Sequence, residues 1–250
     1  MIRLIDVHKA FGQKEVLTGF TLDVNEGETM VIIGYSGTGK SVAIKHIVGL
    51  LEPDKGTVWV DGLEVPKLTR PELYALRAKI GYVFQFAALF DSMTIGDNVA
   101  MGLRKEGRLP ERDIMARVSE ALELVDLPDV ETKMPAELSG GMRKRVGIAR
   151  AIARRPKYIL YDEPTTGLDP VTSAVIDQLM VRMREKLGVT SIVITHDMRS
   201  AYRVGSRIAM LHEGTVRQVG SVDEIQHTSD PIVRQFIEGR ADLELVDAGV

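Results

Sequence analysis

The sequence has 250 residues, of which 44% are hydrophobic and 27% charged, and its formal net charge is −3. This length and composition are typical of a globular protein that buries a sizeable core. The weak negative charge gives no reason to expect nucleic acid or an anionic membrane as the main partner, and the absence of cysteine excludes disulfides and thiolate metal sites.

The first ten residues, MIRLIDVHKA, lack the basic and apolar segments of a signal peptide. Nowhere does an apolar run approach the length that a membrane-spanning helix needs. We therefore expect any role at a membrane to depend on a partner protein.

Three short segments of the first 60 residues have the apolar spacing of strands. Residues 2–7 and 16–24 are two of them, and residues 57–60 are the third, just before an Asp-Gly turn. These segments predict a small antiparallel sheet beside the main core.

Residues 30–41, MVIIGYSGTGKS, join a short apolar run to a glycine-rich turn and a helix start, in the pattern G-x-x-x-x-G-K-[ST]. In this pattern the backbone amides of the turn and the positive end of the helix bind phosphates. We expect the Lys40 ammonium to reach the outer phosphates and the Ser41 hydroxyl to bind Mg²⁺. The predicted phosphate loop comprises Gly34, Tyr35, Ser36, Gly37, Thr38, Gly39, Lys40, Ser41 and Val42.

Three further apolar runs each end in a polar side chain. Gln85 follows the run 80–84, Asp162 and Glu163 follow 158–161, and His196 comes soon after 192–194. Continuous apolar runs are typical of parallel strands buried on both faces, whose ligands bind at the carboxyl ends. If these runs are neighbouring strands, their polar side chains converge on the phosphate loop.

The acidic pair has a chemical interpretation beside that loop. Asp162 suits the outer coordination sphere of Mg²⁺, and Glu163 suits the acceptance of a proton from an attacking water, a role worth about 10²–10⁴ in rate. Without the phosphate loop, a solvated acidic turn would be the simpler interpretation.

Residues 96–155 form a block with helical periodicity. Apolar residues between Ile114 and Val125 follow the spacing of an amphipathic helix, and LSGGM at 138–142 opens a second one. A serine N-cap followed by two glycines, at Ser139, Gly140 and Gly141, could form a second anion site. A plain helix start is the alternative.

The chain resembles the ATP-binding cassette (ABC) ATPases over nearly its whole length. The phosphate loop, Gln85, LSGGM, YILYDE at 158–163, Gly167-Leu168-Asp169 and His196 occur in the order of the family's motifs. The resemblance implies an α/β fold, namely a P-loop NTPase with a RecA-like core, an N-terminal antiparallel β subdomain and an inserted helical subdomain. It also implies ATP and Mg²⁺ as cofactors and ATP hydrolysis as the activity.

The resemblance further implies residue roles. Phe11 would stack on adenine, although an aromatic residue here is as often part of a core. Gln85 would sense Mg²⁺ and the membrane partner, Asp169 would lie between subunits, and His196 would contact the γ-phosphate. In such proteins two copies pair head to tail, and the Ser139-Gly140-Gly141 helix start of one copy closes over the ATP of the other.

On this basis we predict one ABC ATPase domain over residues 1–240. The core and β subdomain would cover about 1–95 and 156–240, and the helical subdomain about 96–155. A weakly ordered tail would follow at 241–250.

Within the family, three segments are similar to the ATPase of the Mce-associated, Mla-type phospholipid transporters: FQFAALFDSMT at 84–94, MPAELSGGM at 134–142 and DPIVRQFIEG at 230–239. This similarity implies a cytoplasmic ATPase on the inner face of the inner (plasma) membrane. A lipid-handling permease would dock near Gln85 and residues 86–95, and an Mce-type substrate-binding component would complete the complex.

Other functions stay open from the sequence. One is an ABC importer ATPase for a small solute such as an amino acid. Others are a soluble cassette acting on DNA or ribosomes, and a nucleotide sensor that does not hydrolyse ATP. The basic helix between Arg143 and Arg155 could contact nucleic acid, but a solvated charged face explains it more simply, and we expect no nucleic acid partner.

Overall fold

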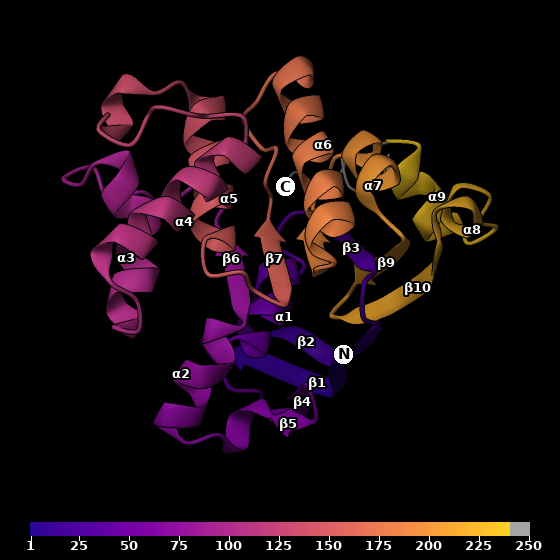
Figure 1. Ribbon diagram of the computed structural model, residues 1–250. Helices are drawn as coiled ribbons and strands as arrows, with labels where there is room; N and C mark the ends of the chain where they lie inside the picture. Colours follow the sequence, from indigo (N-terminus) through magenta and orange to yellow (C-terminus); the bar gives the residue numbers. More distant parts are fainter. Residues whose placement is uncertain (241–250) are drawn as a thin grey trace.

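The computed structural model describes residues 1–240, so the predicted tail at 241–250 lies outside the described residues. The described chain contains a four-stranded and a six-stranded sheet with helices around them (Figure 1). This arrangement confirms the predicted α/β fold with an antiparallel β subdomain and a helical insert.

The four-stranded sheet has the order β2-β1-β4-β5 and is antiparallel throughout. Its strands are β1 (Ile2–Phe11), β2 (Lys14–Val24), β4 (Lys55–Val60) and β5 (Leu63–Glu64). In the register, Ile2 pairs with Val24 on one side and with Val60 on the other. All three side chains are buried, which explains the apolar spacing of these segments.

The six-stranded sheet has the order β10-β9-β3-β8-β7-β6. Its strands are β3 (Thr29–Ile33), β6 (Ile80–Val83), β7 (Tyr158–Asp162), β8 (Thr190–Ile194), β9 (Arg207–His212) and β10 (Thr215–Ser221). All neighbours are parallel except the β9-β10 pair. The four strands predicted to be neighbours, β3, β8, β7 and β6, are consecutive in the sheet, so their carboxyl ends lie along one edge.

The helices lie in different parts of the molecule (Figure 1). Those before β7 are α1 (Lys40–Ile47), α2 (Arg70–Ala78), α3 (Ile95–Glu106), α4 (Glu111–Leu124) and α5 (Gly140–Ile152). Those after β7 are α6 (Pro170–Leu187), α7 (Met198–Val204), α8 (Val222–Gln226) and α9 (Pro231–Ile237). Short 3₁₀ turns lie at Val65–Lys67 and Pro135–Glu137. Helices α3, α4 and α5 contact one another and lie on the opposite side of the molecule from α8 and α9.

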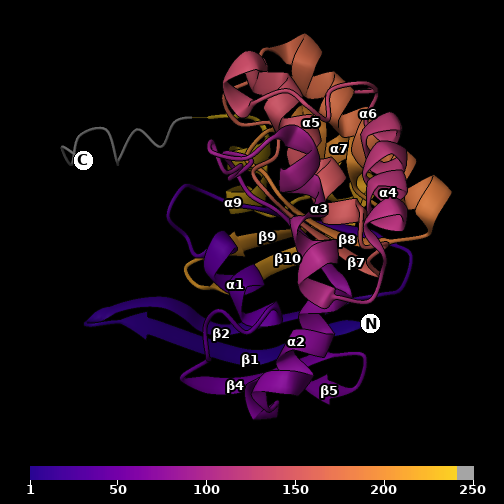
Figure 2. The ribbon, with the colours of Figure 1, turned by 60° about the vertical axis from the view of Figure 1, so that its left-hand side comes forward.

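Strand β3 separates two hydrophobic cores, because successive side chains of a strand point to opposite faces. Val31 and Ile33 belong to the core shared with α3–α7, whereas Met30 and Ile32 face a second core. That second core lies between the two sheets and includes α1, and Figure 2 shows this layering from the side. The phosphate loop follows β3 directly, so the strand that leads into the loop is packed on both of its faces.

Across residues 1–240, no helix has both the length and the apolar character that a membrane span requires.

Candidate functional site

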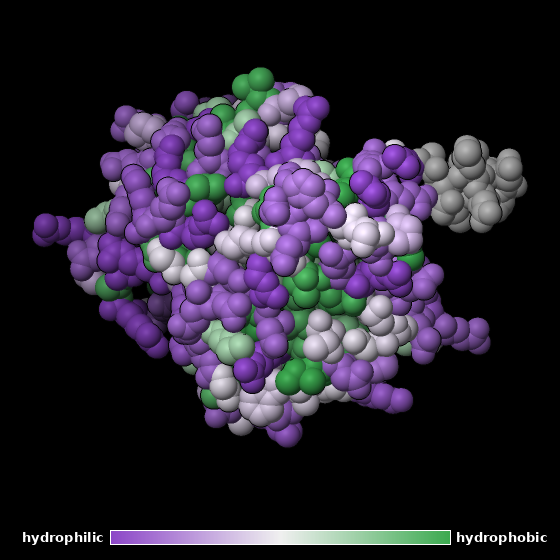
Figure 3. Space-filling view, turned by 90° about the vertical axis from the view of Figure 1, so that its right-hand side faces the viewer, coloured by the Kyte–Doolittle hydropathy of each residue, from purple (hydrophilic) through white to green (hydrophobic). Residues whose placement is uncertain are grey.

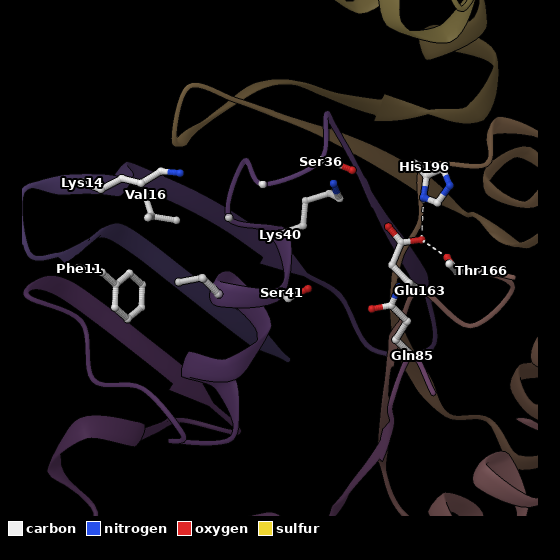
Figure 4. A pocket seen from close by; sticks show the side chains of 13 residues that line it. Phe11, Lys14, Val16, Ser36, Lys40, Ser41, Gln85, Glu163, Thr166 and His196 are labelled. Carbon is white, nitrogen blue, oxygen red and sulfur yellow. Dashed lines mark hydrogen bonds and ion pairs between the residues drawn. The ribbon is translucent and has the colours of Figure 1, made fainter. Parts of the chain in front are cut away.

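A cavity of about 610 Å³ lies where the carboxyl edge of the six-stranded sheet meets the antiparallel sheet. It is lined by Phe11, Lys14, Val16, Ser36, Gly37, Gly39, Lys40, Ser41, Val42, Gln85, Glu163, Thr166 and His196. In Figure 4, Phe11, Lys14 and Val16 lie at one end, and Gln85, Glu163, Thr166 and His196 lie at the other. Lys40 and Ser41 lie between these two groups.

The phosphate loop needs glycine where its backbone turns. Gly34 has φ +148°, and a Cβ added there would lie 2.4 Å from the Leu211 carbonyl oxygen. Gly39 has φ +103°, and its Cβ would lie 2.8 Å from Val16 Cγ1. At these two glycines the loop therefore packs directly on β9 and β2, with no room for a side chain.

Lys40 is buried, with 7% of its surface exposed, and its ammonium donates to the carbonyl oxygens of Gly34 and Tyr35, both at 2.8 Å. Burial lowers the pKa of Lys40, while the nearby charges of Glu163 and Asp162 act in the opposite direction. The Lys40 ammonium is therefore a desolvated donor, and it forms no ion pair with a carboxylate among residues 1–240. A buried cation of this kind can bind an anion.

Ser41 and Asp162 are joined by a hydrogen bond across the sheet edge. The Ser41 hydroxyl donates to Asp162 Oδ1 at 2.7 Å, and the Tyr82 hydroxyl donates to Oδ2 at 3.0 Å. Burial, followed by the charge and hydrogen bond of Asp162, raises the pKa of Tyr82, which stays protonated. A hydroxyl and a carboxylate are hard oxygen donors, so this pair fits Mg²⁺ chemically.

Glu163 lines the cavity and has an unusual backbone conformation. Its φ of +52° costs about 1–3 kcal/mol for a residue with a side chain, and its amide donates to the Ile194 carbonyl oxygen at 3.0 Å. Glu163 Oε2 accepts from Thr166 Oγ1 at 2.9 Å and lies 2.9 Å from His196 Nδ1 (Figure 4). The end of β7 thereby places a fixed carboxylate opposite Lys40.

Phe11 lies at the open end of the cavity with 49% of its surface exposed. The Lys9 ammonium is 5.8 Å from the centroid of its ring. An exposed aromatic face of this kind can stack on a flat heterocycle. Phe11 is therefore not the core residue that the alternative interpretation allowed.

Sequence reasoning missed three residues that line the cavity. Lys14 pairs with Phe11 in the β1-β2 hairpin. The turn between these two residues is the sequence signal that could have placed Lys14 beside Phe11. Val16 follows two residues later on the same strand, and Thr166 lies three residues beyond Glu163.

Four predicted site residues lie away from this cavity. Ser139 caps α5 by accepting from the Met142 amide at 3.2 Å, and Asp169 caps α6 by accepting from the Val171 and Thr172 amides. A Cβ added at Gly141 would lie 2.5 Å from Thr172 Cγ2, so the two helix starts are neighbours. Ser139, Gly140 and Asp169 are exposed. They therefore form a second polar surface that this cavity does not use.

The segment around Gln85 forms an exposed aromatic surface. Phe84, Phe86 and Phe90 are 42%, 82% and 51% exposed, and Phe84 and Phe90 line a groove of about 410 Å³. Buried Asn98 holds this segment, because its side chain bonds the backbone of Phe90, Met93 and Thr94.

The basic helix α5 is only partly the solvated face that we expected. Lys144 is buried and donates to the Thr166 carbonyl oxygen at 2.6 Å. Arg150 donates to the carbonyl oxygens of Ala87 and Ala88 at 2.5 and 2.6 Å. The carbonyl groups of these loops need hydrogen-bond donors, and Lys144 and Arg150 supply them. Because both side chains bond to protein, the interpretation as a solvated face is wrong for them.

A family model described as "ABC transporter" matches residues 17–166. The probable ribonucleotide transport ATP-binding protein mkl of Mycobacterium leprae is 40% identical over 232 residues, which is 93% of this chain and 67% of that protein. The methionine import ATP-binding protein MetN of Carboxydothermus hydrogenoformans is 45% identical over 218 residues, 87% of this chain and 64% of that protein. The chloroplastic protein TRIGALACTOSYLDIACYLGLYCEROL 3 of Arabidopsis thaliana is 39% identical over 259 residues, 97% of this chain and 74% of that protein.

Two solved structures are similar in fold and sequence. One is the dimeric post-hydrolysis state of the ATP-binding cassette MJ0796 bound to ADP and phosphate, with a TM-score of 0.81 and 35% identity over 89% of this chain and 99% of that one. The other is cbiO1 from Clostridium perfringens, part of the transporter complex cbiONQ, with a TM-score of 0.83 and 29% identity over 99% and 97%.

Proposed function

The chain belongs to the ABC transporter family, as an ATP-hydrolysing cassette that binds ATP with Mg²⁺, and on that premise we propose that it powers the movement of a phospholipid between membranes through a partner permease. One observation carries the proposal. Of the three named relatives above, TRIGALACTOSYLDIACYLGLYCEROL 3 aligns with the largest share of this chain, 97%, and of its own length, 74%, and its name is that of a glycerolipid.

In the proposed mechanism the cavity holds one ATP along its length. Phe11 stacks on the adenine, the amides of the phosphate loop and Lys40 bind the phosphates, and His196 contacts the γ-phosphate. Ser41, Gln85 and Asp162 would hold Mg²⁺, which neutralises phosphate charge when bound. The open end, the loop and the acidic end occur in this order in the cavity (Figure 4), which supports the assignment.

Glu163 acts in this proposal as the general base. It accepts a proton from a water whose oxygen attacks the γ-phosphorus, and the bond to the bridging oxygen breaks as ADP leaves. Its fixed backbone and its contacts with Thr166 and His196 support this role, because they hold the carboxylate at the phosphate end of the cavity.

We also propose that two copies pair head to tail. The exposed start of α5 at Ser139–Gly141 and the Asp169 segment would then cover the γ-phosphate end of the partner's cavity. Gly140 tests this pairing, because a Cβ added there meets nothing within 4 Å in the protomer. We expect Gly140→Asp to fold normally, since an acidic residue in the first turn of a helix is favourable. It should still bind nucleotide but lose most ATP hydrolysis, and wild-type hydrolysis would remove the proposed pairing.

The permease would dock on the aromatic surface beside Gln85, at residues 86–95. Exposed Phe84 and Phe90, which line a groove of about 410 Å³, and exposed Phe86 support this placement, because patches of exposed aromatics mark interaction surfaces. With that partner the cassette would lie on the cytoplasmic face of the inner membrane, and an Mce-type component would complete the transporter. The same proposal treats residues 1–240 as one cassette with a helical subdomain at about 96–155.

A small-solute importer is the second candidate, favoured by the 45% identity to the methionine import protein. To separate the two, the Glu163→Gln protein is extracted with its membrane partners from its own host and examined by native mass spectrometry. Wild-type complex in nanodiscs is then assayed for ATP hydrolysis with added phospholipid or methionine. We expect bound phospholipid and stimulation by lipid; a lipid-free complex stimulated by methionine would select the importer.

A further inference from the structure

Tyr35 joins the phosphate loop to the C-terminal part of the described chain. Its ring lies 5.0 Å from the ring of Phe236 in α9, at an interplanar angle of 84°. The ring of His212, at the end of β9, lies 6.5 Å away on a tilted plane. Edge-to-face contact at this distance is a favourable geometry for two aromatic rings. The phosphate loop therefore has an aromatic contact with a helix about 200 residues away in the sequence.

The position of Tyr35 also determines where Lys40 is held. The Tyr35 carbonyl oxygen accepts from the Lys40 ammonium at 2.8 Å and from the Thr38 hydroxyl at 2.9 Å. Gly34, on the other side of Tyr35, packs against the Leu211 carbonyl with no room for a Cβ. Fixing the Tyr35 ring consequently fixes the backbone of the loop at the point where its amides and lysine meet a phosphate.

Helix α9, which carries Phe236, is attached to the rest of the protein by a buried side chain and by a capped, ion-paired start. Val233 is fully buried in the core shared with the six-stranded sheet. Asp230 caps the helix by accepting from the Ile232 and Val233 amides, and it is paired with Arg217 at 2.8 Å. Figure 3 shows the side of the molecule on which α8, α9 and β10 lie, where hydrophobic side chains near the centre are surrounded by hydrophilic ones.

We propose that Phe236 is a positioning residue for ATP binding, acting through Tyr35 to keep the phosphate loop in the conformation that receives the phosphates. This rests on the proposed binding role of residues 34–42. The loop has glycines at φ +148°, +77° and +103°, so without a side-chain anchor its backbone can adopt many conformations. Ordering such a loop on binding costs conformational entropy, whereas a loop ordered beforehand binds more tightly.

The test is a titration with the Mg²⁺ complex of the non-hydrolysable analogue AMP-PNP by calorimetry. An aromatic pair of this geometry is worth about a two- to twelvefold change in an equilibrium constant, so we expect Phe236→Ala to raise the Kd by that factor. Phe236→Tyr, which keeps the ring, should bind as the wild type does. Arg234→Ala is the matched control, because Arg234 lies exposed on the same helix and pairs only with Glu238 among the described residues.

A double-mutant cycle with Tyr35→Ala separates positioning from a general structural role. If Phe236 acts through Tyr35, Phe236→Ala should have no further effect in the Tyr35→Ala protein. In steady-state hydrolysis, Phe236→Ala should raise the KM for ATP and leave kcat near the wild-type value. Equal losses in both backgrounds, or an unchanged Kd in Phe236→Ala, would overturn the inference.

Two further measurements keep the result decisive. Should Phe236→Ala lower the melting temperature too far for titration, Phe236→Leu replaces it, because leucine keeps an apolar group against the core and removes the ring. Lys40→Ala is titrated in parallel. Lost binding in Lys40→Ala with an unchanged Kd in Phe236→Ala would refute only the positioning role, whereas unchanged binding in both would refute the proposed phosphate site as well.

Discussion

Replacing Glu163 by glutamine changes one oxygen of the side chain to an amide nitrogen and leaves its volume almost unchanged. The side chain is 13% exposed, so its surroundings rather than bulk water determine its properties. Glutamine can still accept a hydrogen bond from Thr166, and its other terminal atom can face His196. The fold around β7 should therefore persist, and the change removes only the negative charge and the basic oxygen.

The size of the effect follows from the proposed role of Glu163. Loss of a positioned general base lowers a rate by about 10²–10⁴, which corresponds to about 2.7–5.5 kcal/mol in the barrier. Binding should not fall, because Lys40 and the loop amides remain and one negative charge near the phosphates is gone. Since hydrolysis would no longer separate the two copies, ATP should accumulate a dimer in Glu163→Gln.

Three assays on purified protein check this prediction. Phosphate release at saturating Mg²⁺-ATP measures turnover, calorimetry measures nucleotide affinity, and light scattering after size-exclusion chromatography measures the dimer. Glu52→Gln is the control, since Glu52 is exposed and outside the cavity and the variant loses the same charge. Turnover within about threefold of the wild type would refute the role of Glu163 as the base.

Three other changes have expected outcomes. Lys40→Ala should weaken binding of Mg²⁺-ATP at least tenfold by calorimetry, because it removes the charged donor of the loop; unchanged affinity would contradict this. Burial raises the pKa of Asp61, but hydrogen bonds from Lys157 and Tyr158 outweigh it and lower the pKa from 3.8 to about 2. A pKa lowered in the folded state adds stability above about pH 4 that is lost as the pH falls through about 2. Urea unfolding should thus show Asp61→Asn about 1 kcal/mol less stable at pH 7, with the difference shrinking towards pH 2, and a difference independent of pH would contradict the assignment. Asn98→Ala should lower the free energy of unfolding by about 2 kcal/mol and expose the loop after Gln85 to proteolysis, whereas an unchanged digestion rate would show that the loop does not depend on it.

Much of the fold and the site was predictable because the signals are local. The phosphate loop needs glycines at fixed spacing, and Ser139 occupies the N-cap position directly before its helix. Polar side chains after Ile80–Val83, Tyr158–Asp162 and Thr190–Ile194 lie together because these strands are parallel neighbours.

The missed features depend on contacts between distant segments. No local sequence pattern places β9 beside β3, because this pairing joins residues about 180 positions apart. The contact of Tyr35 with Phe236 and the buried state of Lys144 follow from the same tertiary packing, which spacing along one helix does not report.

Helix α5 offers a physical route between the proposed permease surface and the proposed dimer surface. Near its end, Arg150 donates to the carbonyl oxygens of Ala87 and Ala88, which have φ values of +59° and +47°. Burial lowers the pKa of Arg150, yet a guanidinium keeps its proton at neutral pH, so these bonds persist. At its start, Gly141 packs on Thr172 next to the Asp169 segment. If α5 moves as a unit, closure of two copies over the partner's ATP would shift the loop after Gln85 and the groove beside it.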